Sequence, residues 1–228
     1  MDAFFWLVRI TNFKISSSSS NAVSSYEEFG KDTLSSKFTL TENDSYITFD
    51  VEVTNYGSND VGVLSIEEIT STGLVPEIIN YNLKDKICDD NGKCNQMAVK
   101  TFQIKFSAAP GEYEINYKLD FRTYHKVIYT DITNNNYPTE VIDGGDLNVT
   151  FSEDLKNILV LSNGEEINSY NQITNGQTIT IENVESDIEI KKKAPVARLV
   201  NGRIDEVGGE VCIGEECFYI ISNDGSTV

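Results

Sequence analysis

Two short segments of the sequence place paired cysteines among residue types that take part in metal binding and redox chemistry. CDDNGKC sets Cys88 and Cys94 around two acids, an amide, a glycine and a lysine, and CIGEEC holds Cys212 and Cys217 near the end of the chain. Clustered carboxylates suit calcium, whereas paired thiols suit zinc, a redox centre or a disulfide. Each of these sites implies a different kind of protein.

A calcium loop of the EF-hand type does not fit the first segment. With Gly92 at the sixth position, Ile87 and Ala98 fall where a ligand and a bidentate glutamate are required. Looser calcium sites stay open, one formed by Asp89, Asp90 and Asn91 and one by the acids of IDGGD, Asp143 and Asp146. Asp, Asn and Gly favour turns, so solvated turn acids explain both segments better, and we predict no cofactor.

The cysteine spacing favours disulfides. The gaps of five and four residues within the pairs, and the long separation between the pairs, do not suit structural zinc, and C-x-x-C is absent. Cysteines that face each other across a hairpin lie within disulfide range, so we predict two local bonds, Cys88–Cys94 and Cys212–Cys217, among the three pairings that four cysteines allow. Disulfides indicate an extracellular protein, and reduced thiols in a cytoplasmic protein are the alternative.

No constellation in the sequence predicts catalysis. The single histidine, His125, lies in TYHKVIYT without a nucleophile motif around it, and no phosphate-binding glycine loop is present. Neighbouring acids such as Glu67 and Glu68 arise by chance in a chain with 36 Asp and Glu. We therefore predict that the protein is not an enzyme, with an undetected active site as a further hypothesis.

The net charge of -18 and the pI near 4.3 argue against nucleic acid and anionic lipid as partners, because both would be repelled. No stretch approaches the roughly 20 apolar residues of a membrane span. The short apolar segment AFFWLV near the N-terminus predicts either a first strand or the remnant of an anchor, and Val8, Ile10 and Phe13 favour the strand.

Alternation of apolar and polar residues is the dominant pattern, and it predicts an all-β fold of tandem antiparallel β-sandwich modules. Three segments carry it, and their predicted buried faces are Ile47, Phe49, Val51 and Val53; Ala98, Phe102, Ile104 and Phe106; and Tyr113, Ile115, Tyr117, Leu119 and Phe121. Residues 16–25, SSSSSNAVSS, predict a long loop, and helical turns are expected at most around residues 24–29.

Changes in composition and in the spacing of the predicted strands divide the chain into four parts. Residues 1–122 form a β-sandwich domain, and residues 123–191 form a smaller β-rich module. The lysine run and Pro195 predict a linker over residues 192–205. Residues 206–228 open a hairpin with EVCI and CFYIIS, which we interpret as the start of a further module, although it is also consistent with an added pair of strands in the second sheet.

Several phrases resemble immunoglobulin-like surface domains of Gram-positive gut bacteria. YITFDVEVTNYGSNDVGVLSI and APGEYEINYKLDF resemble their strands, and Tyr113 stands where a tyrosine-corner residue bonds its own backbone. YTDITNNNYPTEVIDGGDLNVTF with NVESDIEI is similar to modular cell-surface proteins, and EVCIGEECFYIISNDGSTV to the opening of a C-type-lectin-like module. The resemblance also implies Lys–Asn isopeptide bonds, for which Lys100, Lys105 and Lys118 are the strand lysines.

This resemblance implies a non-catalytic stalk or adhesion region at the bacterial cell surface. Its partners would be a host or microbial surface protein or a glycan. The alternative is a carbohydrate-binding sandwich that stacks sugars on tyrosines or on Trp6.

Overall fold

The computed structural model describes residues 7–19, 22–43, 45–70, 72–133 and 136–193, and four short strands between residues 199 and 219. Every regular element in this described part is a β-strand, so the protein is all-β as predicted. The chain divides into two compact units. The first contains the described residues up to His125 with Val141–Asp146 and Glu182–Glu185, and the second begins at Lys126. The division falls between His125 and Lys126, three residues beyond the predicted boundary at 122/123, and both positions lie inside β8 (Gly111–Thr130).

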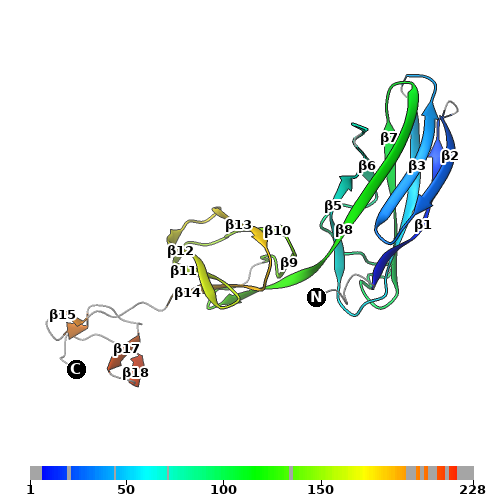
Figure 1. Ribbon diagram of the computed structural model, residues 1–228. Coiled ribbons are helices and arrows are strands. Elements are labelled where there is room, and N and C mark those ends of the chain that lie inside the picture. Colours follow the sequence, from blue (N-terminus) through cyan, green and yellow to red (C-terminus); the bar gives the residue numbers. More distant parts are fainter. Residues whose placement is uncertain are drawn as a thin grey trace. The chain divides into compact units, whose positions relative to one another are not determined.

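The first unit is a sandwich of two four-stranded antiparallel layers (Figure 1). One layer has the order β1-β4-β7-β6, formed by Val8–Ser18, Tyr46–Asn55, Ala98–Ser107 and Glu77–Ile79. In the other layer β8 pairs on one edge with β3 (Thr33–Leu40), followed by β2 (Ala22–Phe29), and on its other edge with β5 (Val61–Glu68).

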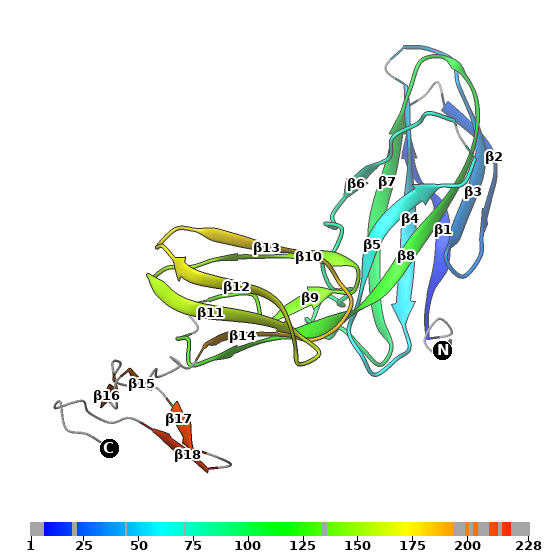
Figure 2. The same ribbon diagram turned by 60° about the vertical axis from the view of Figure 1, so that its left-hand side comes forward.

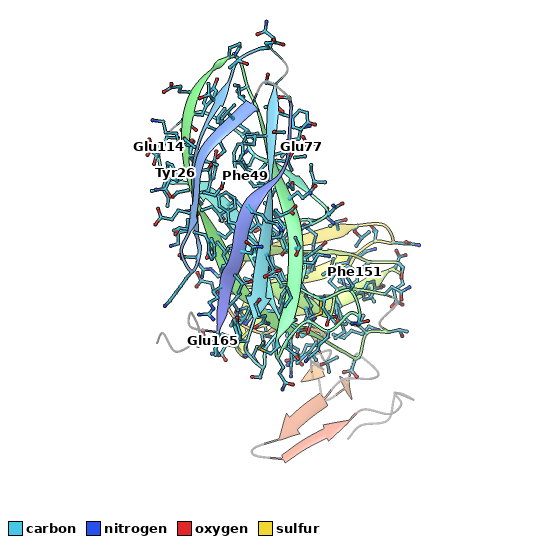
Figure 3. The ribbon with its side chains drawn as sticks, turned by 90° about the vertical axis from the view of Figure 1, so that its right-hand side faces the viewer. Tyr26, Phe49, Glu77, Glu114, Phe151 and Glu165 are labelled. Atoms are coloured by element: carbon cyan, nitrogen blue, oxygen red, sulfur yellow. A yellow bond between two sulfur atoms is a disulfide. The ribbon has the colours of Figure 1, made fainter. Side chains whose placement is uncertain are left out.

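The predicted apolar faces form the core between these layers. Ile47, Phe49, Val51 and Val53 are fully buried, and Phe49 stacks on Phe13 with ring centroids 4.8 Å apart. Phe49 lies between the layers in Figure 3, where Tyr26 and Glu114 lie together on one outer side and Glu77 on the other. This core accounts for the alternation, because each strand has one face toward the other layer and one toward water.

The serine-rich segment is a strand pair, and the predicted loop and helical turns are wrong. β1 continues through Ser18, and β2 occupies Ala22–Phe29. The serine hydroxyls satisfy neighbouring carbonyls, as when Ser16 donates to Thr48 O at 3.3 Å and Ser25 to Lys37 O at 2.9 Å. β2 is an edge strand that buries little surface, so the lack of an alternating apolar face does not prevent its pairing with β3.

In the second unit, β12-β11-β14-β8 form one sheet and β10 and β13 pair separately (Figure 2). The new strands are β10 (Gly145–Thr150), β11 (Leu155–Ser162), β12 (Glu165–Ile173), β13 (Thr178–Val184) and β14 (Ile188–Lys192); the short β9 (Glu140–Ile142) also pairs with β8. β14 runs parallel to the end of β8, with Ile188 opposite Val127. The unit has its own buried core, which includes Val149, Phe151, Ile158 and Ile190.

Four short strands follow as two separate pairs. β15 (Leu199–Val200) pairs with β16 (Arg203–Ile204), and β17 (Glu210–Ile213) pairs with β18 (Glu216–Tyr219). The second pair is the expected EVCI/CFYIIS hairpin, and it forms a two-stranded sheet of its own. The rest of the predicted linker beyond Lys193, and the rest of residues 206–228, lie outside the described residues.

Candidate functional site

The candidate site is the long loop between β6 and β7 in the first unit, residues 80–97, which a disulfide closes. Cys88 and Cys94 form the predicted local bond. They do not face each other across two paired strands, as the sequence suggested, because the loop's own turns bring them together. Next to Cys88, Ile87 is fully buried and its N–H donates to Val61 O at 2.8 Å, which fixes the start of the closed ring to β5.

The acids of this ring organise its turn. Asp89 Oδ1 accepts hydrogen bonds from the N–H groups of Asn91 and Lys93, both at 2.9 Å. Gly92 has a φ of 80°, in the left-handed region that favours glycine, so a side chain there would strain the turn. Asp90 and Asn91 are exposed at the tip. One carboxylate oxygen of Asp89 is thus committed to the backbone, which is the turn role that the sequence favoured over calcium.

Asp60 attaches both ends of the ring to the turn between β4 and β5. Its Oδ2 accepts from Lys86 Nζ at 2.8 Å, and its Oδ1 accepts from Asn95 Nδ2 at 3.1 Å. Asn55 adds a second attachment, because its Nδ2 donates to Cys94 O at 2.9 Å and to Asn59 O at 2.8 Å. Lys86 and Asn95 stand just outside the two cysteines, so one carboxylate joins the two stems of the loop.

The amine, carboxylate and carboxamide of Lys86, Asp60 and Asn95 are the groups from which an isopeptide bond forms. The Lys86 and Asp60 side chains are 28% and 27% exposed, so water reaches the ion pair, whereas isopeptide bonds form between buried groups. Of the three lysines singled out from the sequence, Lys105 pairs with Glu77 at 3.1 Å and Lys118 lies 3.9 Å from Asp32.

An open hollow of about 360 Å3 lies beside the closed ring. Its lining is mostly polar: Ile78, Asn80, Tyr81, Asn82, Asp85, Lys86, Cys88, Asp89 and Lys100. Burial raises the pKa of Tyr81 to about 12, and its hydroxyl donates to Asp85 O while accepting from Val63 N–H. Lys100 makes no ion pair with the described residues, so its amine is available to a small ligand carrying negative charge or polar oxygens.

The second pair of calcium candidates lies elsewhere in the first unit and is engaged by protein groups. The Asp143 carboxylate contacts two side chains: its Oδ2 lies 3.1 Å from Arg122 Nη1, and its Oδ1 lies 2.9 Å from His125 Nε2. A hydrogen bond to Asp120 raises the pKa of Arg122, so its positive charge persists beside Asp143. Asp146 accepts the N–H of Asn183 at 3.1 Å. Asp143 is thus bound to the Arg122 and His125 side chains, and Asp146 to a backbone N–H group.

The remaining expected features divide between the described and the undescribed residues. Tyr113 Oη donates to Ala109 O at 2.7 Å, four residues upstream, which is the expected tyrosine-corner contact. The paired acids Glu67 and Glu68 serve different partners, because Ser65 donates to Glu67 and the Thr72 hydroxyl lowers the pKa of Glu68. Cys212 and Cys217 face each other in the register of β17 and β18, and their side chains, like Trp6, lie outside the described residues.

No group of three or more metal-ligating side chains occurs in the part of the chain that the structure describes. That part also holds no helix long and apolar enough to cross a membrane. Comparison with known proteins adds no identity: no family model, curated protein or solved structure matches the chain. The fold and the site together define an all-β protein with a sandwich-like first unit and a disulfide-closed surface loop.

Proposed function

We propose that this chain is a non-catalytic spacer region of an exported bacterial cell-surface protein, built from immunoglobulin-like sandwich modules. The observation that carries the proposal is the Cys88–Cys94 disulfide on the surface of a sandwich. A disulfide persists in an oxidising compartment and is rare in the cytosol. The immunoglobulin-like assignment is supported by the two four-stranded layers and by the Tyr113–Ala109 contact.

The surface chemistry of the described residues supports a spacer rather than a sugar-stacking platform. Tyr26 and Phe29 are the exposed aromatic side chains there, and both belong to the edge strand β2. Sugar-binding platforms need several aromatic rings on one face, and the outer side of β3 instead presents Ser35, Lys37 and Thr39. A polar outer face and a well-filled core suit a module that holds other parts of a protein apart.

Two measurements test this proposal. Non-reducing peptide mapping of the protein purified from its native envelope is expected to recover Cys88 and Cys94 in one disulfide-linked peptide. Free thiols at both positions would remove the argument for export. A glycan array probed with this chain is expected to give no reproducible binding, and consistent hits would contradict a role limited to spacing.

The second candidate function is small-ligand binding in the hollow beside the ring, and the uncommitted Lys100 amine favours it. If glycan hits are found, Lys100→Ala and Asn80→Ala should abolish them. The matched control is Lys37→Ala on the outer face of β3, away from the hollow, which should leave binding unchanged. Hits that survive both hollow variants would place the binding surface elsewhere.

A further inference from the structure

Three Asn–Gly pairs lie at turns in the described residues, and they differ in one backbone contact. The pairs are Asn91–Gly92, Asn163–Gly164 and Asn175–Gly176, and their glycines all have a left-handed φ, at 80°, 84° and 82°. An asparagine before glycine is chemically labile, because glycine has no Cβ to keep its amide nitrogen away from the asparagine carboxamide. All three asparagines are exposed, so water and hydroxide reach each of them.

The glycine N–H is hydrogen-bonded at two of these turns. Gly92 N–H donates to Asp89 O at 2.9 Å inside the disulfide-closed ring, and Gly176 N–H donates to Phe151 O at 2.8 Å. A nitrogen held in this way keeps its proton and its orientation, and it cannot turn toward the side chain of the preceding residue. Both sites are therefore protected by the fold.

The third turn lacks this protection. Asn163 and Gly164 are the two central residues of the hairpin between β11 and β12, whose flanking residues Ser162 and Glu165 pair with each other. The Gly164 N–H makes no hydrogen bond within the described part of the chain, and neither does the Asn163 carboxamide. β12 is an edge strand that pairs with β11 alone, so this hairpin opens more readily than a central strand pair.

We propose that Asn163 is a site of spontaneous covalent modification through its own backbone. The deprotonated Gly164 nitrogen attacks the Asn163 side-chain carbonyl carbon, a new N–C bond forms, and the carboxamide nitrogen leaves as ammonia. Water then opens the cyclic imide at either carbonyl and leaves aspartate or isoaspartate. No oxidant, reductant or other protein is needed.

The two products change the hairpin in different ways. Aspartate adds a negative charge next to Glu165 and Glu166 in an already acidic turn. Isoaspartate lengthens the backbone by one carbon in a turn whose two residues both have a left-handed φ, at 50° and 84°, so the tight reversal is lost. The modification loosens the pairing of β12 with β11 at this end of the hairpin.

The test compares the three sites within one sample. The purified, oxidised chain is incubated in mildly alkaline buffer, and digests taken over time are scored for the mass gain of about 1 Da and for isoaspartate. The Asn163 peptide is expected to convert about fivefold faster than the other two, the ratio that corresponds to one hydrogen bond of about 1 kcal/mol. The chain reduced and unfolded in urea is the reference, because there the three rates report local sequence alone.

The result is decisive in either direction. A folded-state preference for Asn163 that shrinks in urea supports the proposal. Equal protection of all three sites, or faster conversion at Asn91 or Asn175 in the folded chain, overturns it. Asn163→Gln, which cyclises far more slowly, should remove the fastest of the three compared conversions while the Asn91 and Asn175 rates stay unchanged. A change in those two rates would show a disturbed fold instead.

Discussion

Asp60 shows how a single carboxylate determines the structure around it. Asp60→Ala removes the carboxylate that accepts from both Lys86 Nζ and Asn95 Nδ2, so we expect the free energy of unfolding to fall by about 1–2 kcal/mol. Urea denaturation followed by circular dichroism measures the change. Asp90→Ala is the matched control, since Asp90 is an exposed loop acid in the same segment and should alter stability by less than about 0.5 kcal/mol. Equal effects of the two variants would contradict the bracing role of Asp60.

Tyr81 gives the first unit a defined response to alkaline pH. Its pKa is raised from the usual 10.0 to about 12 by burial, so the neutral hydroxyl is favoured in the folded state. The stability that this contributes is complete below pH 10 and is lost as the pH rises toward 12.

Tyr81→Phe isolates this contribution. At neutral pH the variant should be less stable by about 1–3 kcal/mol, because the Val63 N–H and the Asp85 carbonyl lose their partner. The difference in stability between the two proteins should then narrow from pH 10 to pH 12, as measured by denaturation at each pH. A difference that stays constant or widens over that range would show that the hydroxyl is not protected from ionisation.

For single residues, the sequence predicted which residue types form the loop's turn, but not which distant side chains bind each other. The acids around Gly92 were identified because turn-forming residues stand together in CDDNGKC. Asp60 was missed, since its partners Lys86 and Asn95 are distant in the chain and meet it only after β5 and the loop have folded. A lone acid between a turn and the start of β5 carries no signal of that role.

At the scale of elements, the disulfide-closed ring is a constraint on one loop of the sandwich. The double variant Cys88→Ser, Cys94→Ser is expected to lose about 2 kcal/mol of stability, because a ring of this size removes little entropy from the unfolded chain. Amide exchange should rise at Gly92 and Lys93, whose N–H groups depend on the closed turn, and remain slow in β4 and β7. Loss of protection in those central strands would mean that the bond holds the whole layer together.

The strands themselves were the most predictable feature of the protein. Alternation selected the buried faces of β4, β7 and β8 correctly, because a period of two is visible without any knowledge of the partner strands. The same reasoning failed for β2, whose two faces both mix polar and apolar side chains. An edge strand is determined by the backbone hydrogen bonds of its neighbour, and these leave no mark on its side chains.

For the molecule as a whole, the net charge of -18 destabilises the folded state, because the like charges repel one another more strongly when the chain is compact. Raising NaCl from about 0.05 to about 0.3 M shortens the Debye length, so we expect the melting temperature to rise. Differential scanning calorimetry measures it, with sucrose at matched osmolarity as the control for effects other than screening. A fall in melting temperature would mean that ion pairs such as Lys86–Asp60 outweigh the repulsion.

The division into units lies three residues from the predicted boundary at 122/123, and both positions fall inside one strand. The spacing of predicted strands and turns changes near TYHKVIYT, and the sequence analysis separated two modules there. In the structure, β8 runs from Gly111 to Thr130 without a break. A boundary inside a strand has no glycine, proline or polar run to mark it. The parallel pairing of β14 with the end of β8 is a contact between distant segments, and alternation alone does not reveal it.

The small size of the Cys88–Cys94 ring affects which cysteines pair with each other while the chain is still unfolded. The two cysteines are six positions apart, so each finds the other in the unfolded chain at a far lower entropic cost than it finds Cys212 or Cys217. Chain entropy therefore favours the local bond over a pairing with either distant cysteine. The β1–β4 and β3–β8 pairings join segments far apart in the chain, so each of them carries a larger loop-closure cost than the ring does.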